Sequence, residues 1–221
     1  MNRTKIEWAD YSVNPIKGIC KNDCFYCYAK RMYKRFGWDP HIRPDFTVFA
    51  GLEAIKPSRI FIGSMHDIFG EWVPATWIRA IISSCGNYPQ HTFLFLTKNP
   101  KRYSKFKFPQ NCWLGTSIEN DKNVGRLYDL CKATKGRNKI FISFEPLLSG
   151  MTEVMYYRPE LKKLDWIIIG GLTPKPVHED KWVLDLIDFI RILTYSAHIN
   201  LPIFLKDNLK FGVETKEFPV Q

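Results

Sequence analysis

Short, nearly continuous apolar runs alternate along the chain with segments of helical periodicity. Unbroken apolar runs are typical of β-strands that are buried on both faces of a sheet. The runs predict seven strands, at residues 5–8, 59–63, 92–96, 112–116, 139–144, 166–170 and 203–205.

Three longer helical segments lie between these strands. The first begins at Pro74 and stops before Gly86, the second follows Asp121, and the third runs from about residue 180 to residue 196. The apolar residues expected to face the core of these helices are Trp77, Ile78, Ile81, Ile82, Val124, Leu127, Tyr128, Cys131, Val183, Leu186, Ile187 and Ile190.

The repeated strand–helix units predict an α/β fold with a parallel sheet and right-handed crossovers. A closed eightfold barrel takes about 250 residues, and this chain has 221. We therefore expect an open, partial parallel β/α barrel of six to seven strands, formed by one domain that spans residues 1–221.

Polar residues follow the apolar strands at the positions where catalytic groups of such folds lie. One interpretation is a shared pocket at the carboxyl ends of the strands. The other is turn and capping chemistry, which suits Asp67 and Asn120 in particular. The polar residues are Ser64, His66, Asp67, Thr97, Lys98, Ser117, Glu119, Glu145, Lys206 and Asp207.

Composition and charge narrow the class of protein. Apolar residues make up 45% of the chain, enough for a sizeable core, and the longest apolar stretch, around residues 166–172, is too short to cross a bilayer. The N-terminus has no apolar signal segment, so we expect a soluble, cytoplasmic protein without a membrane partner.

The net charge is +10, with basic groups at residues 30–35, 98–107 and 132–139. Their role is either nucleic-acid binding or simple solvation of the surface.

Three of the six cysteines, Cys20, Cys24 and Cys27, lie within eight residues in the spacing C-x3-C-x2-C. Three close thiolates can hold three irons of a cubane cluster and leave the fourth iron open, whereas electron-transfer cubanes use four cysteines. A structural zinc site is the competing interpretation, but zinc commonly needs a second ligand pair, which is missing here. A chance grouping of thiols is the third. Cys85, Cys112 and Cys131 are scattered and are expected to be small buried side chains.

The cysteine motif, with the aromatic Tyr26 directly before its last cysteine, resembles that of the radical S-adenosylmethionine superfamily. More closely, the chain is similar to an uncharacterised phage- and prophage-associated three-cysteine group related to spore photoproduct lyase. The similarity runs through nearly the whole chain. It is carried by residues 4–8 (TKIEW), 24–29 (CFYCYA), 61–69 (FIGSMHDIF), 96–102 (LTKNPKR), 113–120 (WLGTSIEN), 142–148 (ISFEPLL) and 165–171 (DWIIIGG).

This resemblance implies a [4Fe–4S] cluster on Cys20, Cys24 and Cys27, with S-adenosylmethionine bound at the open iron. The resulting adenosyl radical would take a hydrogen atom from a substrate that the sequence does not name. Nucleic acid or a nucleotide is the candidate, and a reductant protein such as flavodoxin or ferredoxin would supply the electron. The cofactor supplies the radical chemistry, and the protein supplies placement and polarity.

The resemblance also implies a set of cofactor contacts. Ser64 would meet the methionine amine, Lys98 the carboxylate, and Tyr26 the adenine. Ser117 and Glu119 would bind the ribose or the amine, and Gly170 and Gly171 would admit a cofactor edge close to the backbone. The alternatives are a surface lysine for Lys98, packing beneath the loop for Tyr26, and a favourable helix-dipole position for Glu119.

Three residues are candidates for catalysis. Glu145 lies between an apolar strand and Pro146, where an unpaired carboxylate is costly, so we expect it to pair with a lysine, cofactor or substrate. His66 is a candidate proton donor or a structural histidine, and Lys206 could reach the mouth of the barrel. The chain departs from the group at Leu172, where an acidic residue is common. The alternative function is a non-catalytic, basic nucleic-acid-binding protein with a zinc-stabilised cysteine loop.

Overall fold

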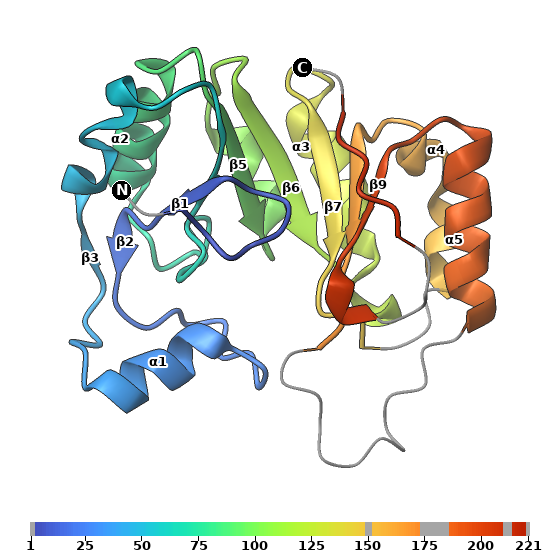
Figure 1. Ribbon diagram of the computed structural model, residues 1–221, viewed down its shortest axis with the longest axis horizontal. Coiled ribbons are helices and arrows are strands. Elements are labelled where there is room, and N and C mark those ends of the chain that lie inside the picture. The colour runs from blue at the N-terminus through green and yellow to red at the C-terminus, as the bar shows by residue number, and fades with distance from the viewer. Residues whose placement is uncertain (1–2, 149–151, 173–185, 210–213, 220–221) are drawn as a thin grey trace.

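A computed structural model describes residues 3–148, 152–172, 186–209 and 214–219. Its centre is a curled, seven-stranded sheet in the order β1-β4-β5-β6-β7-β8-β9, in which each neighbouring pair is parallel (Figure 1). The predicted partial barrel is confirmed. The strands are β1 (Tyr11–Val13), β4 (Arg59–Ile62), β5 (Thr92–Thr97), β6 (Cys112–Ser117), β7 (Ile140–Phe144), β8 (Trp166–Ile169) and β9 (Ile203–Leu205).

The first strand was predicted wrongly, because residues 5–8 form a turn and β1 follows at Tyr11–Val13. The backbone N–H of Ala9 donates to the carbonyl of Ile6 at 3.1 Å, and Trp8 then packs its ring 4.7 Å from that of Phe61. The apolar side chains of this segment therefore fill the inside of the curl and do not extend the sheet.

Helices cover the convex face of the sheet, and the larger apolar core lies between these two layers. They are α2 (Ala75–Gly86), α3 (Gly125–Thr134), the one-turn α4 (Arg158–Leu161) and α5 (Leu186–His198), while α1 (Tyr28–Phe36) lies beyond one end of the sheet. Short 3-10 helices occupy the connections, at Phe46–Phe49, Leu52–Ala54, Pro100–Lys105, Asp121–Asn123, Thr152–Tyr157 and Asp207–Leu209. None of the helices in the described part of the chain is long and apolar enough to cross a membrane.

The inward faces of the second and third predicted helices are partly wrong. Tyr128 of the second helix, predicted to face the core, is 48% exposed, and the third helix is correct in type. Its start and Val183 lie outside the described residues, as do the side chains of Leu186 and Ile187. Ile190, predicted to face the core, is 51% exposed, and Ile192 is buried instead. Both residues are apolar, so the sequence pattern alone did not decide which of them faces inward.

Bulky side chains fill the inside of the curl. This second apolar cluster consists of Trp8, Ala9, Phe61, Leu94, Trp113, Phe141, Trp166, Ile168 and Phe204. The chain near the C-terminus runs antiparallel to β9, with the N–H of Leu205 donating to the carbonyl of Thr215 at 2.7 Å. Two rings of this cluster, Trp8 and Phe61, also line an open space at the carboxyl ends of the strands.

Gly115 on β6 is required by this packing. A Cβ at this position would lie 2.5 Å from the ring of the fully buried Phe141. The carbonyl of Gly115 also accepts a hydrogen bond from the Tyr103 hydroxyl at 2.8 Å, which restricts movement of the strand.

We expect Gly115→Ala to lower the free energy of unfolding by about 2 kcal/mol, because the added methyl overpacks a closed core. Gly125→Ala is the matched control. Its Cβ would meet no atom closer than 3.9 Å, and alanine favours the helix that begins there. Urea denaturation of both variants tests the packing, and equal stabilities would contradict it.

Candidate functional site

The three clustered cysteines lie on the loop that joins β2 (Ile16–Lys17) to α1. All three are free, half-buried thiols, and all three line the same small cavity. The N–H of Cys27 donates to the carbonyl of Cys24 at 3.0 Å, and the Cys27 sulfur caps α1 by accepting from the N–H of Lys30. The start of α1 therefore holds two of the thiols in one turn.

Gly18 fixes the beginning of this loop. Its φ of +96° lies in the region that favours glycine. A Cβ there would lie 2.3 Å from the carbonyl oxygen of His41, in the segment between α1 and the next strand. Its N–H donates to the Tyr33 hydroxyl at 2.6 Å. β2 also pairs with β3 (Arg43–Pro44), so the loop enters from a small sheet of its own.

Asp67 ties the cysteine loop to the main sheet. Its carboxylate accepts from the Asn22 side chain at 2.9 Å, from the Thr97 hydroxyl at 2.7 Å and from the Lys98 N–H at 3.0 Å. It also closes its own turn by accepting from the N–H of Phe69 at 3.0 Å. The turn interpretation of Asp67 was therefore correct but incomplete, since three of these four bonds are tertiary.

His66 supports the same loop and does not line the large cavity beside it. The ring is buried, its Nδ1 lies 3.1 Å from the Gly18 carbonyl, and its Nε2 accepts from the Trp72 indole at 2.8 Å. Burial lowers the pKa of His66, which favours the neutral ring that this pair of bonds requires. Both ring nitrogens are thus occupied by structural partners.

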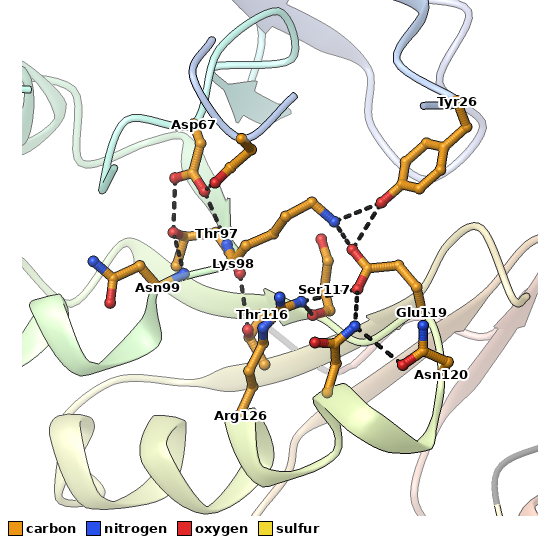
Figure 2. Close-up of polar contacts among 12 residues, drawn as sticks. Tyr26, Asp67, Thr97, Lys98, Asn99, Thr116, Ser117, Glu119, Asn120 and Arg126 are labelled. Atoms are coloured by element: carbon orange, nitrogen blue, oxygen red, sulfur yellow. Dashed lines mark hydrogen bonds and ion pairs between the residues drawn. The ribbon is translucent and has the colours of Figure 1, made fainter. Parts of the chain in front are cut away.

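A polar network joins the cysteine loop to β5 and β6 (Figure 2). Glu119 is 3% exposed, forms ion pairs with Lys98 and Arg126, and accepts from the Tyr26 hydroxyl at 2.8 Å. The Lys98 ammonium donates to the same hydroxyl at 2.6 Å. Two cations and a phenol thus surround one buried carboxylate.

The electrostatics of this network follow from its burial. Burial lowers the pKa of Lys98 to about 8, so the ammonium is still largely protonated at neutral pH and can pair with Glu119. Burial also raises the pKa of the Cys20 thiol to about 11. A metal bound by this thiol would have to displace its proton.

Arg126 was missed by the sequence interpretation. It lies in the first turn of α3, one turn before the buried Leu130, and donates to the Ser117 carbonyl at 2.8 Å as well as to Glu119 at 2.9 Å. The Ser117 side chain is buried. Nothing in the sequence distinguishes Arg126 from a solvated arginine on a helix surface.

A cavity of about 700 Å³ opens at the carboxyl ends of the strands. Of the predicted site residues, Tyr26, Ser64, Glu145, Gly171 and Lys206 line it, and Met65 is shared with the small cavity of the cysteines. Its wall also includes residues that the sequence did not indicate as site residues: Lys5, Trp8, Asn14, Tyr28, Arg31 and Phe61.

Glu145 and Lys206 form an ion pair in this cavity, as the sequence predicted for a carboxylate at this strand end. The Trp8 indole donates to the second carboxylate oxygen of Glu145 at 3.2 Å. A Cβ on Gly170 would lie 2.8 Å from Lys206 and 3.2 Å from Glu145. Gly170 is thus needed to admit the ion pair.

Ser64 lies on the opposite wall. Its hydroxyl donates to the Asn14 side chain at 3.2 Å, and its carbonyl accepts from the Tyr28 hydroxyl at 2.6 Å. Tyr28 is the first residue of α1, so this bond holds the helix that follows the cysteines against the end of β4. Cys85 and Cys112 are buried and Cys131 is half-buried, and none of these three lines the cavity.

The donor set on the loop is suited to an iron–sulfur cluster. Three thiols without a disulfide are the ligands that such clusters use. Within the described ranges, no three His, Cys, Asp or Glu side chains converge on a point that could hold a single metal ion. A cubane requires no such convergence, because each thiolate binds a different iron.

Comparison with known proteins identifies the class of fold. Spore photoproduct lyase complexed with dinucleoside spore photoproduct matches with a TM-score of 0.63 at 15% identity, over 92% of this chain and 78% of that chain. A mutant of that lyase with bound AdoMet and dinucleoside spore photoproduct matches with a TM-score of 0.65, at the same identity and coverage. The chain therefore has the same partial-barrel fold as spore photoproduct lyase.

The chain belongs to the family described as "Protein of unknown function (DUF5131)", whose model matches residues 3–196. No curated protein matches the sequence. These findings do not bear on the expected association with phage or on the cytoplasmic location, which stay predictions.

Asp67→Ala tests whether the cysteine loop depends on its anchor. We expect the free energy of unfolding to fall by about 3 kcal/mol, since four donors lose one charged acceptor. Asp129→Ala, which removes a 3.6 Å pair with the 75% exposed Lys101, should cost less than about 1 kcal/mol. Chemical denaturation measures both changes, and a small effect at Asp67 would refute the anchor.

Proposed function

We propose that this protein is a radical S-adenosylmethionine enzyme that carries a [4Fe–4S] cluster on Cys20, Cys24 and Cys27. One observation supports this most: three free thiols lie on a loop at the carboxyl end of a curled parallel sheet, beside a cavity of about 700 Å³. When bound, the cluster would supply the electron that cleaves S-adenosylmethionine reductively.

The residues of the chain would position the cofactor. Ser64 and Tyr26 line the cavity next to the cysteine loop. Lys98 and Glu119 do not line it, but both contact the Tyr26 hydroxyl in the network of Figure 2. Lys98 brings a positive charge for the methionine carboxylate and Glu119 a negative charge for its amine. Because Arg126 also pairs with Glu119, this carboxylate stays compensated if Lys98 turns toward a ligand.

The substrate would occupy the remainder of the cavity. The Glu145–Lys206 pair and the Trp8 indole that holds it lie on this wall. We propose that Glu145 and Lys206 contact the substrate, and that His66 supports the cysteine loop. Lys5 and Arg31 add positive charge at the cavity, which favours a phosphate-bearing substrate such as a nucleotide or nucleic acid.

The lyase complex with dinucleoside spore photoproduct supports this substrate class by analogy of fold. The proposed chemistry also requires an external reductant, and an electron-transfer protein such as flavodoxin or ferredoxin fits that need.

Cys24→Ala should abolish the visible charge-transfer absorption of anaerobically reconstituted protein and most of its iron. The wild type should bind about four irons and four sulfides per chain. Cys131→Ala, which removes a half-buried thiol far from the loop in sequence, should keep both the visible absorption and the iron content of the wild type. One zinc per wild-type chain without sulfide would support the zinc-loop alternative instead.

Lys98→Met tests the cofactor contact. We expect the Kd for S-adenosylmethionine to rise about tenfold with cluster content unchanged, because a charge-assisted bond of about 1.5 kcal/mol is lost. Lys101→Met, from the same basic segment but 75% exposed, should bind like the wild type. Anaerobic calorimetry measures both. Equal affinities in all three proteins would remove Lys98 from the proposed site.

A further inference from the structure

Two basic segments that are separate in sequence meet in one groove. Lys105 and Lys107 come from residues 98–107, and Arg137 comes from residues 132–139. Arg79 on α2 adds a fourth cation to the same groove, which has a volume of about 710 Å³. The groove lies by the loops that enter β6 and β7, at the end of the sheet opposite the cysteine loop.

Two asparagines fix the walls of this groove. Asn111 donates to the carbonyls of Cys85 and Tyr88 at 3.1 and 3.0 Å, and so ties the end of α2 to the start of β6. Asn138 donates to the carbonyls of Pro109 and Cys112 at 2.8 and 3.1 Å, and so ties the turn after α3 to the same strand. Four side-chain hydrogen bonds therefore hold the backbone around the groove in place.

No acidic residue lines the groove, and none of its four cations forms an ion pair with a carboxylate of the described residues. Arg79 lies 5.8 Å from the centre of the Phe106 ring, and Arg137 donates to the carbonyl of Thr134. The other lining side chains include the hydrogen-bonding groups of Ser83, Asn87 and Ser104. Lys105 also interacts electrostatically with Glu71, which does not line the groove, so the protein neutralises the positive charge of the groove only in part.

We propose that this groove binds the phosphate backbone of a nucleic acid. All four cations are exposed to solvent, so a single small anion would gain little from them. A polyanion gains more, because each neutralised phosphate releases condensed counterions. The one aromatic ring of the groove, Phe106, is buried, so the contact is to the backbone and is independent of base sequence.

This backbone site stands apart from the proposed catalytic function, since it needs neither cluster nor cofactor. It would anchor a polymer at the end of the sheet away from the large cavity. The failure of one proposal leaves the other in place.

The test measures binding of a labelled, mixed-sequence 20-nucleotide single strand to reconstituted protein by fluorescence anisotropy from 50 to about 300 mM KCl. We expect the double variant Arg79→Gln/Lys107→Gln to bind about tenfold more weakly at 100 mM KCl. The slope of log K against log salt should fall by about 1.4, or 0.7 for each lost phosphate contact. The matched control is Lys162→Gln/Lys163→Gln, which removes the same charge from an exposed surface after α4.

The control should bind within about twofold of the wild type, and both double variants should melt near the wild-type temperature because all four positions are exposed. Equal losses in the two double variants would overturn the assignment, since total charge would then explain the binding. It would also be overturned if the wild type failed to bind, or if polyglutamate of equal charge competed as well as the nucleic acid.

Discussion

The direction of the strands is the constraint on which the rest of this structure depends. Because all neighbouring pairs in the main sheet are parallel, every strand ends at the same edge, and every following loop begins there. Asp67 uses this geometry: it follows β4, and its carboxylate reaches both the end of β5 and Asn22 within the cysteine loop. The cysteines thereby acquire a fixed place beside the cavity, although their loop belongs to a separate small sheet.

The two ends of the sheet differ in whether their cations are paired with carboxylates. At the carboxyl end, Lys98, Arg126 and Lys206 are half-buried and compensated, the first two by Glu119 and the third by Glu145. At the amino end, no cation of the groove forms an ion pair with a carboxylate of the described residues. Compensated charges suit a site that binds a small zwitterionic cofactor, and uncompensated ones suit a polyanion.

The sequence predicted six of the seven strands of the main sheet and the parallel open barrel, because strands buried on both faces read as unbroken apolar runs. It mistook residues 5–8 for a strand, since a buried turn with Trp8 has the same local composition as a short strand. The cysteine loop and the pairing of Glu145 could be predicted, because the signal for each lies in residues that are close in sequence. The contacts of Arg126 and the tertiary bonds of Asp67 could not be predicted. They join elements far apart in the chain and leave no periodic signal.

The proposed function rests on an iron with no protein ligand, and electron paramagnetic resonance of the reduced, anaerobic protein tests this most directly. The account predicts a [4Fe–4S] signal that changes when S-adenosylmethionine is added and that couples to a 15N label in the amine of that cofactor. A cluster signal that is unaffected by the cofactor would mean that all four irons already have ligands, and would contradict the account.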